Sequence, residues 1–210
     1  MTLCIYALAT PVAGSLRRRG LEHEPLQIVT VGRVSAVVGE LPRRPSATHD
    51  VLARYDAVVG RLAERYTALL PARFATCVDR DELMFILRSR QQALRRALRH
   101  VRGRAQMTVR LVSDTTDVAP DSPSPAGKGI DYLRRRAAEA AVPAFEPLRV
   151  AVKKWVRDER VEKRRGIATV YHLIPRGATE AYRRAMIARA GQVDLRAIVS
   201  GPFPPYAFTE

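Results

Sequence analysis

Leu69-Leu70-Pro71-Ala72-Arg73-Phe74-Ala75-Thr76 is the stretch that decides how this chain folds. It separates a segment of helical period that ends near Tyr66 from another that begins at Asp79. Because proline lacks an N–H and biases the residue before it toward an extended conformation, the stretch predicts a short strand or connector rather than continued helix. Arg73 stands among apolar neighbours, so it must be paired if buried or keep its head group in water. A structural anchor that ties two packed halves together is favoured for Arg73 over a direct catalytic role.

The residues before this stretch predict a sheet with a helix packed on it. Thr2–Ala9 is almost entirely apolar, which indicates a central strand covered on both faces. The runs 26–31 and 34–38 are rich in β-branched residues and are separated by Gly32-Arg33, which predicts a hairpin. An apolar stripe of period 3.6 runs from Thr48 to Tyr66 and predicts a helix that packs on the strands. The central stretch would then return as a fourth strand.

The residues after the stretch alternate between helix and strand. Asp79, with Glu82 three residues later, resembles a capping box, and one apolar stripe continues from there to Val101, before Gly103 ends the helix. Gln106–Val112 alternates apolar and polar side chains and predicts a half-buried strand. Further on we expect a mobile Ser/Pro-rich loop at 114–128, a helix at 129–141, a helix resuming at Leu148, a charged turn at 159–165, a strand at 167–174, a helix at 179–190 and a strand at 193–199.

These elements indicate an α+β or α/β protein, with an N-terminal α+β domain at 1–76, a C-terminal domain at 77–200 and a tail at 201–210. The hydrophobic fraction of 47% is that of an ordinary globular protein. No stretch approaches the roughly 18 apolar residues that a membrane-spanning helix needs, and residues 1–13 do not resemble a signal peptide. Cys4 and Cys77 are the only cysteines, and a soluble cytosolic protein with two reduced thiols fits them best, with a disulfide between the two as the alternative.

The chain is strongly basic, with a net charge of +15, and only four of its 36 basic residues are lysines. Arginine pairs bidentately with carboxylates and phosphates, so acidic proteins and nucleic acids are both possible partners. Nucleic-acid binding often adds exposed aromatic side chains that stack on bases, but aromatics make up 6% here and most occupy predicted core positions. A basic face for an acidic protein partner is at least as well supported.

The sequence offers little that could carry catalysis or hold a cofactor. The four histidines are scattered, the two cysteines are far apart, and no phosphate-binding glycine motif or nucleophile elbow is present. His49-Asp50 could act as a general base, but capping of the following helix explains the pair better. We therefore expect no catalytic residues, no metal site and no cofactor or small-molecule ligand, and an enzyme ranks last among the functions considered.

The C-terminal tail combines prolines with large aromatic side chains. Prolines pre-set an extended backbone at low entropic cost, while Phe203, Tyr206 and Phe208 carry too much apolar surface to be left in water near a terminus. We expect the tail to dock in cis near the central stretch, across a groove between the two halves. The alternative is a segment that a partner binds in trans.

Three segments carry a resemblance to a known family. Leu70–Thr76, preceded by His49-Asp50, resembles the "HE…LPVRFGT" core of the gas vesicle GvpF/GvpL family, and Gly201–Phe208 resembles its "GPWPPYSF" terminus. Gly129, Tyr132 and Leu133 resemble its "G-x-x-YL" segment. The sequence departs from these motifs with Asp50 for Glu, Ala72 for Val, Ala75 for Gly, Phe203 for Trp and Ala207 for Ser. Of these departures, Ala75 removes a glycine's backbone freedom.

The resemblance implies two α+β domains, the second like a modified ferredoxin fold. It also implies a non-catalytic cytoplasmic assembly factor that associates with the gas vesicle, binds its hydrophobic major shell protein and has no membrane contact. Other gas vesicle accessory proteins are possible further partners. Pro71, Arg73, Phe74, Phe203, Tyr206 and Phe208 are the residues expected to form the partner-binding or structural motif. The alternative is a basic nucleic-acid-binding protein, which the charge alone supports.

Overall fold

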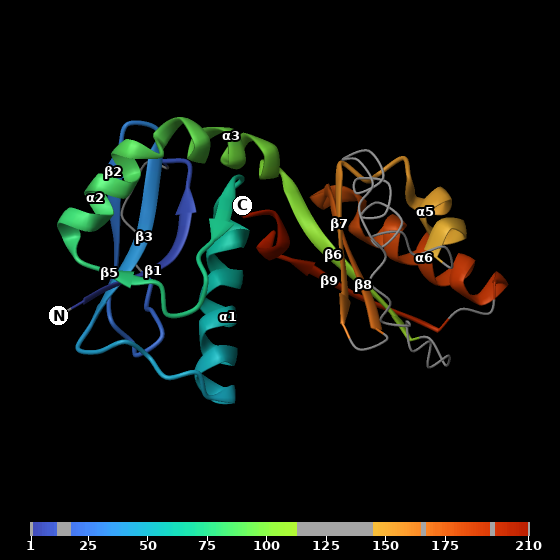
Figure 1. Ribbon diagram of the computed structural model, residues 1–210, viewed down its shortest axis with the longest axis horizontal. Helices are drawn as coiled ribbons and strands as arrows, with labels where there is room; N and C mark the ends of the chain where they lie inside the picture. Colours follow the sequence, from blue (N-terminus) through green and yellow to red (C-terminus); the bar gives the residue numbers. More distant parts are fainter. Residues whose placement is uncertain (1, 12–17, 113–144, 165–166, 194–195, 210) are drawn as a thin grey trace, which may run out of the picture. The chain divides into compact units, whose positions relative to one another are not determined.

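The computed structural model describes the chain except for residues 1, 12–17, 113–144, 165–166, 194–195 and 210 (Figure 1). The described residues form two compact units. One comprises residues 1–106 together with 203–210, and the other comprises residues 107–202. The expected domain boundary at 76/77 therefore differs from the division between the units at 106/107. The mobile loop expected at 114–128 and the helix expected at 129–141 lie outside the described residues.

The N-terminal unit contains a five-stranded antiparallel sheet. Four of its strands follow the order β2-β3-β1-β4, and β5 also pairs with β1. Its strands are β1 (Thr2–Ala9), β2 (Leu26–Val31), β3 (Val34–Leu41), β4 (Leu69–Pro71) and β5 (Cys77–Val78). The hairpin of β2 and β3 is confirmed, and Gly32 has a φ of 57°, a conformation that glycine adopts without steric cost. β1 is central, as expected. β5 was not predicted, because two residues carry no periodic pattern.

Helix α1 (His49–Arg65) covers one face of this sheet. The Thr48 side chain accepts a hydrogen bond from the Val51 N–H and caps the helix, as the sequence predicted. The buried face of α1 packs with residues of β1, β3 and β4 into one hydrophobic cluster; its α1 members are Tyr55, Val58, Val59 and Leu62.

The single helix predicted after Asp79 is wrong: it is two helices, α2 (Arg80–Ser89) and α3 (Gln91–Val101), which break at Arg90. The Asp79 side chain caps α2 by accepting from the Glu82 N–H at 2.7 Å. At the break, Gln91 Nε2 donates to the Val31 carbonyl at 3.1 Å and ties the start of α3 to the β2–β3 hairpin. The break lets each helix lie along the sheet in its own direction, which an apolar stripe alone does not reveal.

The two helices stay with the N-terminal sheet, which explains why the unit extends beyond residue 76. Leu83 and Leu87 of α2 and Leu98 and Val101 of α3 are buried, and both helices contact strands of this sheet. At the end of α3, the Gly103 N–H donates to the Thr67 carbonyl at 2.7 Å. The sequence pattern assigned these helices to the wrong domain because it shows that a helix is amphipathic, not which sheet it covers.

The expectation of two reduced thiols is also wrong for this structure, in which a disulfide joins Cys4 and Cys77. The pairing of β5 with β1 sets the two residues directly opposite each other, with 4.0 Å between their Cα atoms. Because 73 residues separate the two cysteines along the chain, the sequence alone does not show that they are neighbours in the sheet. The disulfide closes the loop that contains the central stretch onto the middle strand of the sheet.

The C-terminal unit has a sheet of strand order β7-β8-β6-β9 with helices α5 and α6 packed against it. Its described elements are β6 (Arg104–Val112), α5 (Glu146–Val152), β7 (Asp158–Arg164), β8 (Ile167–Pro175), η2 (Arg176–Ala178), α6 (Thr179–Gln192) and β9 (Ala197–Phe203). The predicted strand at 106–112, the strand at 167–174 and the helix at 179–190 are confirmed. Buried side chains from both helices and from β6 and β8 form its core.

Two sequence predictions in this unit are wrong. The charged turn expected at 159–165 is strand β7, which pairs antiparallel with β8 from Asp158 to Arg164. Its charged side chains are compatible with a strand because β7 lies at the edge of the sheet, where charge is common. The last strand begins at Ala197 rather than Val193 and continues through Phe203, so part of the expected tail belongs to the sheet.

Candidate functional site: an apolar groove beside the central stretch

An apolar groove of about 490 Å³ opens on the N-terminal unit, on the sheet face opposite α1. Successive residues of a strand point to opposite faces, so Leu70 lines the groove while Leu69 belongs to the cluster under α1. Helices α2 and α3 form the other wall. The lining residues are Ile5, Leu8, Leu70, Pro71, Ala72, Arg73, Thr76, Val78, Leu83, Ile86, Leu87, Arg90, Leu94 and Thr209.

The edge of the groove combines two positive charges with apolar surface. Arg73, from the central stretch, and Arg90, from the break between α2 and α3, are its only ionisable lining residues within the described chain, and both are exposed. The groove-facing side chains of α2 are Leu83, Ile86 and Leu87. The arrangement suits an apolar segment with acidic residues at its margin.

The other face of the central stretch is closed by aromatic side chains. Phe74 packs edge-on against Tyr55, with 5.3 Å between ring centroids, and Tyr55 stacks on Tyr6 at 5.4 Å. The Tyr55 hydroxyl donates to the Ala72 carbonyl at 2.9 Å, which fixes the stretch to α1. Burial raises the pKa of the Tyr55 phenol well above its usual range, so this donor keeps its proton. Phe74 is thus a structural residue of this face and does not line the groove.

The last residues of the chain pack onto the same unit. The Tyr206 hydroxyl donates to Asp56 of α1 at 2.7 Å, and the Ala207 N–H donates to the Gln106 side chain at 2.8 Å. Helix η3 (Tyr206–Phe208) lies against β4, and Phe208 is 2% exposed. Phe203, at the end of β9, is 37% exposed. Of the residues singled out in the sequence, Pro71 and Arg73 therefore line the groove, and Tyr206 and Phe208 pack as structural residues.

Ala75 adopts a φ of 58° in the turn that follows Phe74. This left-handed conformation is costly for any residue with a Cβ and free for glycine. The position is the one at which the sequence carries alanine in place of the glycine of the "LPVRFGT" motif. The turn is held by Thr76, whose N–H and hydroxyl both donate to the Arg73 carbonyl, at 3.1 and 2.7 Å.

A buried polar network lies in the C-terminal unit and was not recognised in the sequence. His172 is fully buried, with Nδ1 2.7 Å from the Tyr182 hydroxyl and Nε2 2.7 Å from Glu159 Oε2. Arg149 donates to both oxygens of the same carboxylate, at 2.9 and 3.1 Å. The hydrogen bond from His172, followed by the bonds from Arg149, lowers the pKa of Glu159 to about 2. Every member is partnered, and the hydrogen bonds join α5, α6, β7 and β8 to one another.

The His49-Asp50 pair has no catalytic geometry. His49 Nδ1 lies 3.6 Å from Asp50 Oδ1, and both side chains are almost completely exposed at the start of α1. Within the described residues, no group of three or more His, Cys, Asp or Glu side chains could hold a metal ion. No helix in that part of the chain is long and apolar enough to cross a membrane.

The fold of the chain is similar to that of solved gas vesicle proteins. The crystal structure of GvpF from Anabaena sp. PCC7120 aligns with a TM-score of 0.77 at 15% identity, covering 100% of this chain and 96% of that one. GvpF from Microcystis aeruginosa aligns with a TM-score of 0.78 at 14% identity, covering 100% and 99%. No curated protein sequence matches the chain.

The profile of the gas vesicle synthesis protein GvpL/GvpF family matches residues 3–210. The chain therefore belongs to this family, as the sequence motifs indicated, and has a role related to gas vesicles. At 14–15% identity, the structural likeness establishes the fold alone.

Proposed function

We propose that this chain is a non-catalytic assembly factor of the cytoplasm and the growing gas vesicle, and that its groove binds an apolar segment of the hydrophobic major shell protein. An unassembled shell subunit exposes apolar surface and would aggregate unless that surface were masked. A protein that masks it and later releases it needs an apolar surface and no reactive groups. Other accessory proteins of the vesicle would be secondary partners.

The observation that carries this proposal is the open apolar groove in a chain that belongs to a gas vesicle synthesis family. Its volume of about 490 Å³ falls within the range of ligand-binding pockets, roughly 300–1,000 Å³. The groove lies between a strand and two helices, so an inserted helix or extended segment would meet apolar side chains on both walls. Arg73 and Arg90 would pair with carboxylates next to that segment.

Capture of the shell subunit by groove variants tests the proposal. Ile86→Gln places a polar side chain in the groove, and Ile187→Gln makes the same change at an exposed site on α6 of the other unit. Burying an unpaired amide against apolar surface costs about 1–3 kcal/mol, so we expect Ile86→Gln to weaken capture about tenfold or more. Ile187→Gln should capture as the unaltered protein does. Equal capture by all three proteins would exclude the groove as the binding surface.

We further propose that the C-terminal unit is a modified ferredoxin-like fold and that the tail is a structural clamp in cis. The described elements β6, α5, β7, β8, α6 and β9 follow the order βαββαβ, and the sheet order β7-β8-β6-β9 supports this description. For the tail, the bond from Tyr206 to Asp56 and the burial of Phe208 support packing in cis. Deletion of residues 204–210 should then lower the melting temperature sharply, and an unchanged melting temperature would contradict the clamp.

A further inference from the structure

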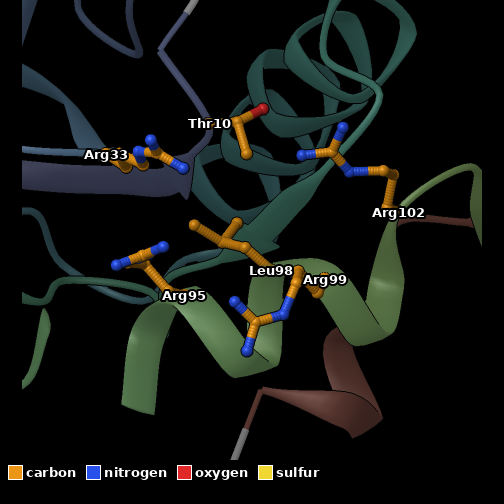
Figure 2. A pocket seen from close by; sticks show the side chains of 6 residues that line it. All are labelled: Thr10, Arg33, Arg95, Leu98, Arg99 and Arg102. Atoms are coloured by element: carbon orange, nitrogen blue, oxygen red, sulfur yellow. The ribbon is translucent and has the colours of Figure 1, made fainter. Parts of the chain in front are cut away.

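Four arginines line a second, smaller hollow on the N-terminal unit, separate from the apolar groove. Its volume is about 120 Å³, and its lining residues are Thr10, Arg33, Arg95, Leu98, Arg99 and Arg102. Figure 2 shows the arginine side chains distributed around Leu98 and Thr10. Neither the groove nor the fold requires this concentration of positive charge.

The frame that carries these arginines is fixed by packing and by backbone contacts. Arg95, Arg99 and Arg102 follow one another at helical spacing along α3 and its end, beside the buried Leu98. Arg33 comes from the β2–β3 turn, which the hydrogen bond from Gln91 to the Val31 carbonyl ties to the start of α3. The Thr10 N–H donates to the Ala68 carbonyl, so the end of β1 is held as well. Three separate elements thus present their side chains to one hollow.

The positive charge of this hollow is not neutralised by the protein residues that the structure describes. None of the ion pairs or side-chain hydrogen bonds among those residues involves the guanidinium groups of Arg33, Arg95, Arg99 or Arg102. Arg149 of the C-terminal unit, in contrast, binds two carboxylates. Like charges four residues apart on a helix destabilise it, so Arg95 and Arg99 weaken the isolated helix that carries them. An anion that binds between them would reverse this effect.

We propose that this arginine hollow binds a short chain of phosphate groups, either the triphosphate of a nucleotide or inorganic polyphosphate. The guanidinium fork matches the geometry of phosphate oxygens and binds them bidentately. The hollow is smaller than the sites that enclose drug-sized ligands, about 300–1,000 Å³, so it suits one or two phosphate groups with the rest of the ligand outside. No aromatic side chain lines it for stacking on bases, which argues against single-stranded nucleic acid. The proposal does not depend on capture of the shell protein.

Isothermal titration calorimetry with tripolyphosphate at 150 mM salt tests the site. The variant R95Q/R99Q removes two lining arginines, and R88Q/R96Q removes the same charge from α2 and α3 outside the hollow. Because a charge-assisted bond to phosphate is among the strongest hydrogen bonds, we expect R95Q/R99Q to lose at least about 30-fold in affinity. R88Q/R96Q should lose less than about threefold, because its charges act at longer range through screening salt. Should R95Q/R99Q fail to fold, R33Q/R102Q, which alters no residue inside a helix, takes its place.

Three further ligands distinguish the source of the phosphates and complete the test. Equal affinities for ATP and tripolyphosphate would assign binding to the phosphate chain alone, and tighter binding of ATP would point to a nucleotide. Orthophosphate should bind at least about tenfold more weakly than tripolyphosphate, since it reaches fewer of the arginines. Three results would overturn the proposal: no binding of tripolyphosphate at 150 mM salt, equal losses in the two double variants, or tighter binding of a hexaglutamate peptide, which would indicate an acidic protein partner.

Discussion

The two faces of the N-terminal sheet differ in how completely helices and side chains cover them. The face under α1 is closed: Tyr55 and Leu62 are buried, and Phe74 and Tyr206 pack against the same cluster. The face under α2 and α3 stays open over about 490 Å³, although it is lined by residues of the same apolar kind. Apolar side chains therefore serve stability on one face and remain available for binding on the other. Substitutions should affect stability on the closed face and binding on the open one.

Truncation of the tail's buried aromatic should give the largest loss of stability. Phe208→Ala should lower the free energy of unfolding by about 3–5 kcal/mol, because it leaves a cavity where a fully packed ring stood. Phe203→Ala, at a partly exposed ring, should cost less than about 1 kcal/mol. Urea denaturation of both variants measures the difference. Equal costs would mean that Phe208 contributes no more to stability than an exposed side chain does.

Matched leucines on the two faces test the comparison directly. Leu62→Ala, on the closed face, should cost about 3 kcal/mol, since Leu62 is fully buried in the cluster under α1. Leu94→Ala, on the open face, should cost about 1 kcal/mol, because Leu94 is only half-buried and its truncation mainly enlarges an existing groove. Denaturation midpoints that shift by the same amount in both variants would show that the faces are equally closed.

In the C-terminal unit, charged side chains help to hold the helices and strands together, so the free energy of unfolding should depend on pH. Glu159→Gln should lower the free energy of unfolding at pH 7 on the order of 2–3 kcal/mol, since it removes a carboxylate that His172 and Arg149 stabilise. The pKa of Glu159 is lowered to about 2, so its contribution is complete above about pH 4.5 and is lost as the pH falls toward 2. Thermal melts from pH 7 to pH 2 should show the wild-type protein and the variant converging in acid. Glu146→Gln, at a more exposed partner of Arg149, is the control; a pH-independent gap for Glu159→Gln would rule out this role.

The smallest effect is expected in the turn between the two faces, and it is a gain. Ala75→Gly should raise the free energy of unfolding by about 0.5–1 kcal/mol, because glycine adopts the φ of 58° without the Cβ clash. Ala72→Gly, three residues earlier at a position without positive φ, should lower it by a similar amount through chain entropy. If both variants lose stability in calorimetry, the Ala75 turn is not strained.

The sequence predicted the framework of the fold where period and turn chemistry were strong. β1, the β2–β3 hairpin, α1 with its Thr48 cap and the strands β6 and β8 all follow from local patterns. The break at Arg90, the two-residue strand β5 and the disulfide of Cys4 with Cys77 do not, because each depends on which distant segment lies alongside. β7 was not predicted, because its run of charged residues is also typical of a turn. Only its place at the edge of the sheet explains why a strand can carry them.

The candidate site was also predictable only in part, because local patterns do not show which distant segments lie alongside each other. Pro71 and Arg73 were singled out from the central stretch, and they do line the groove. Ile86 and Leu94, on its other wall, belong to an apolar stripe that was assigned to the core, and nothing in the stripe shows that it is incompletely covered. The arginine hollow was equally hidden: Arg33 and Arg95 meet only through the contact between the hairpin and α3.

Hydrogen–deuterium exchange in the presence of the shell subunit tests the central claim most directly, because it reports on both faces at once. We predict slower exchange after binding in peptides that cover β4, α2 and the first half of α3, at residues 69–73 and 83–94, and no change across α1 at 49–65. Ile86→Gln should abolish that protection, and Ile187→Gln should leave it intact. Protection confined to α1 or to the C-terminal unit would contradict the account.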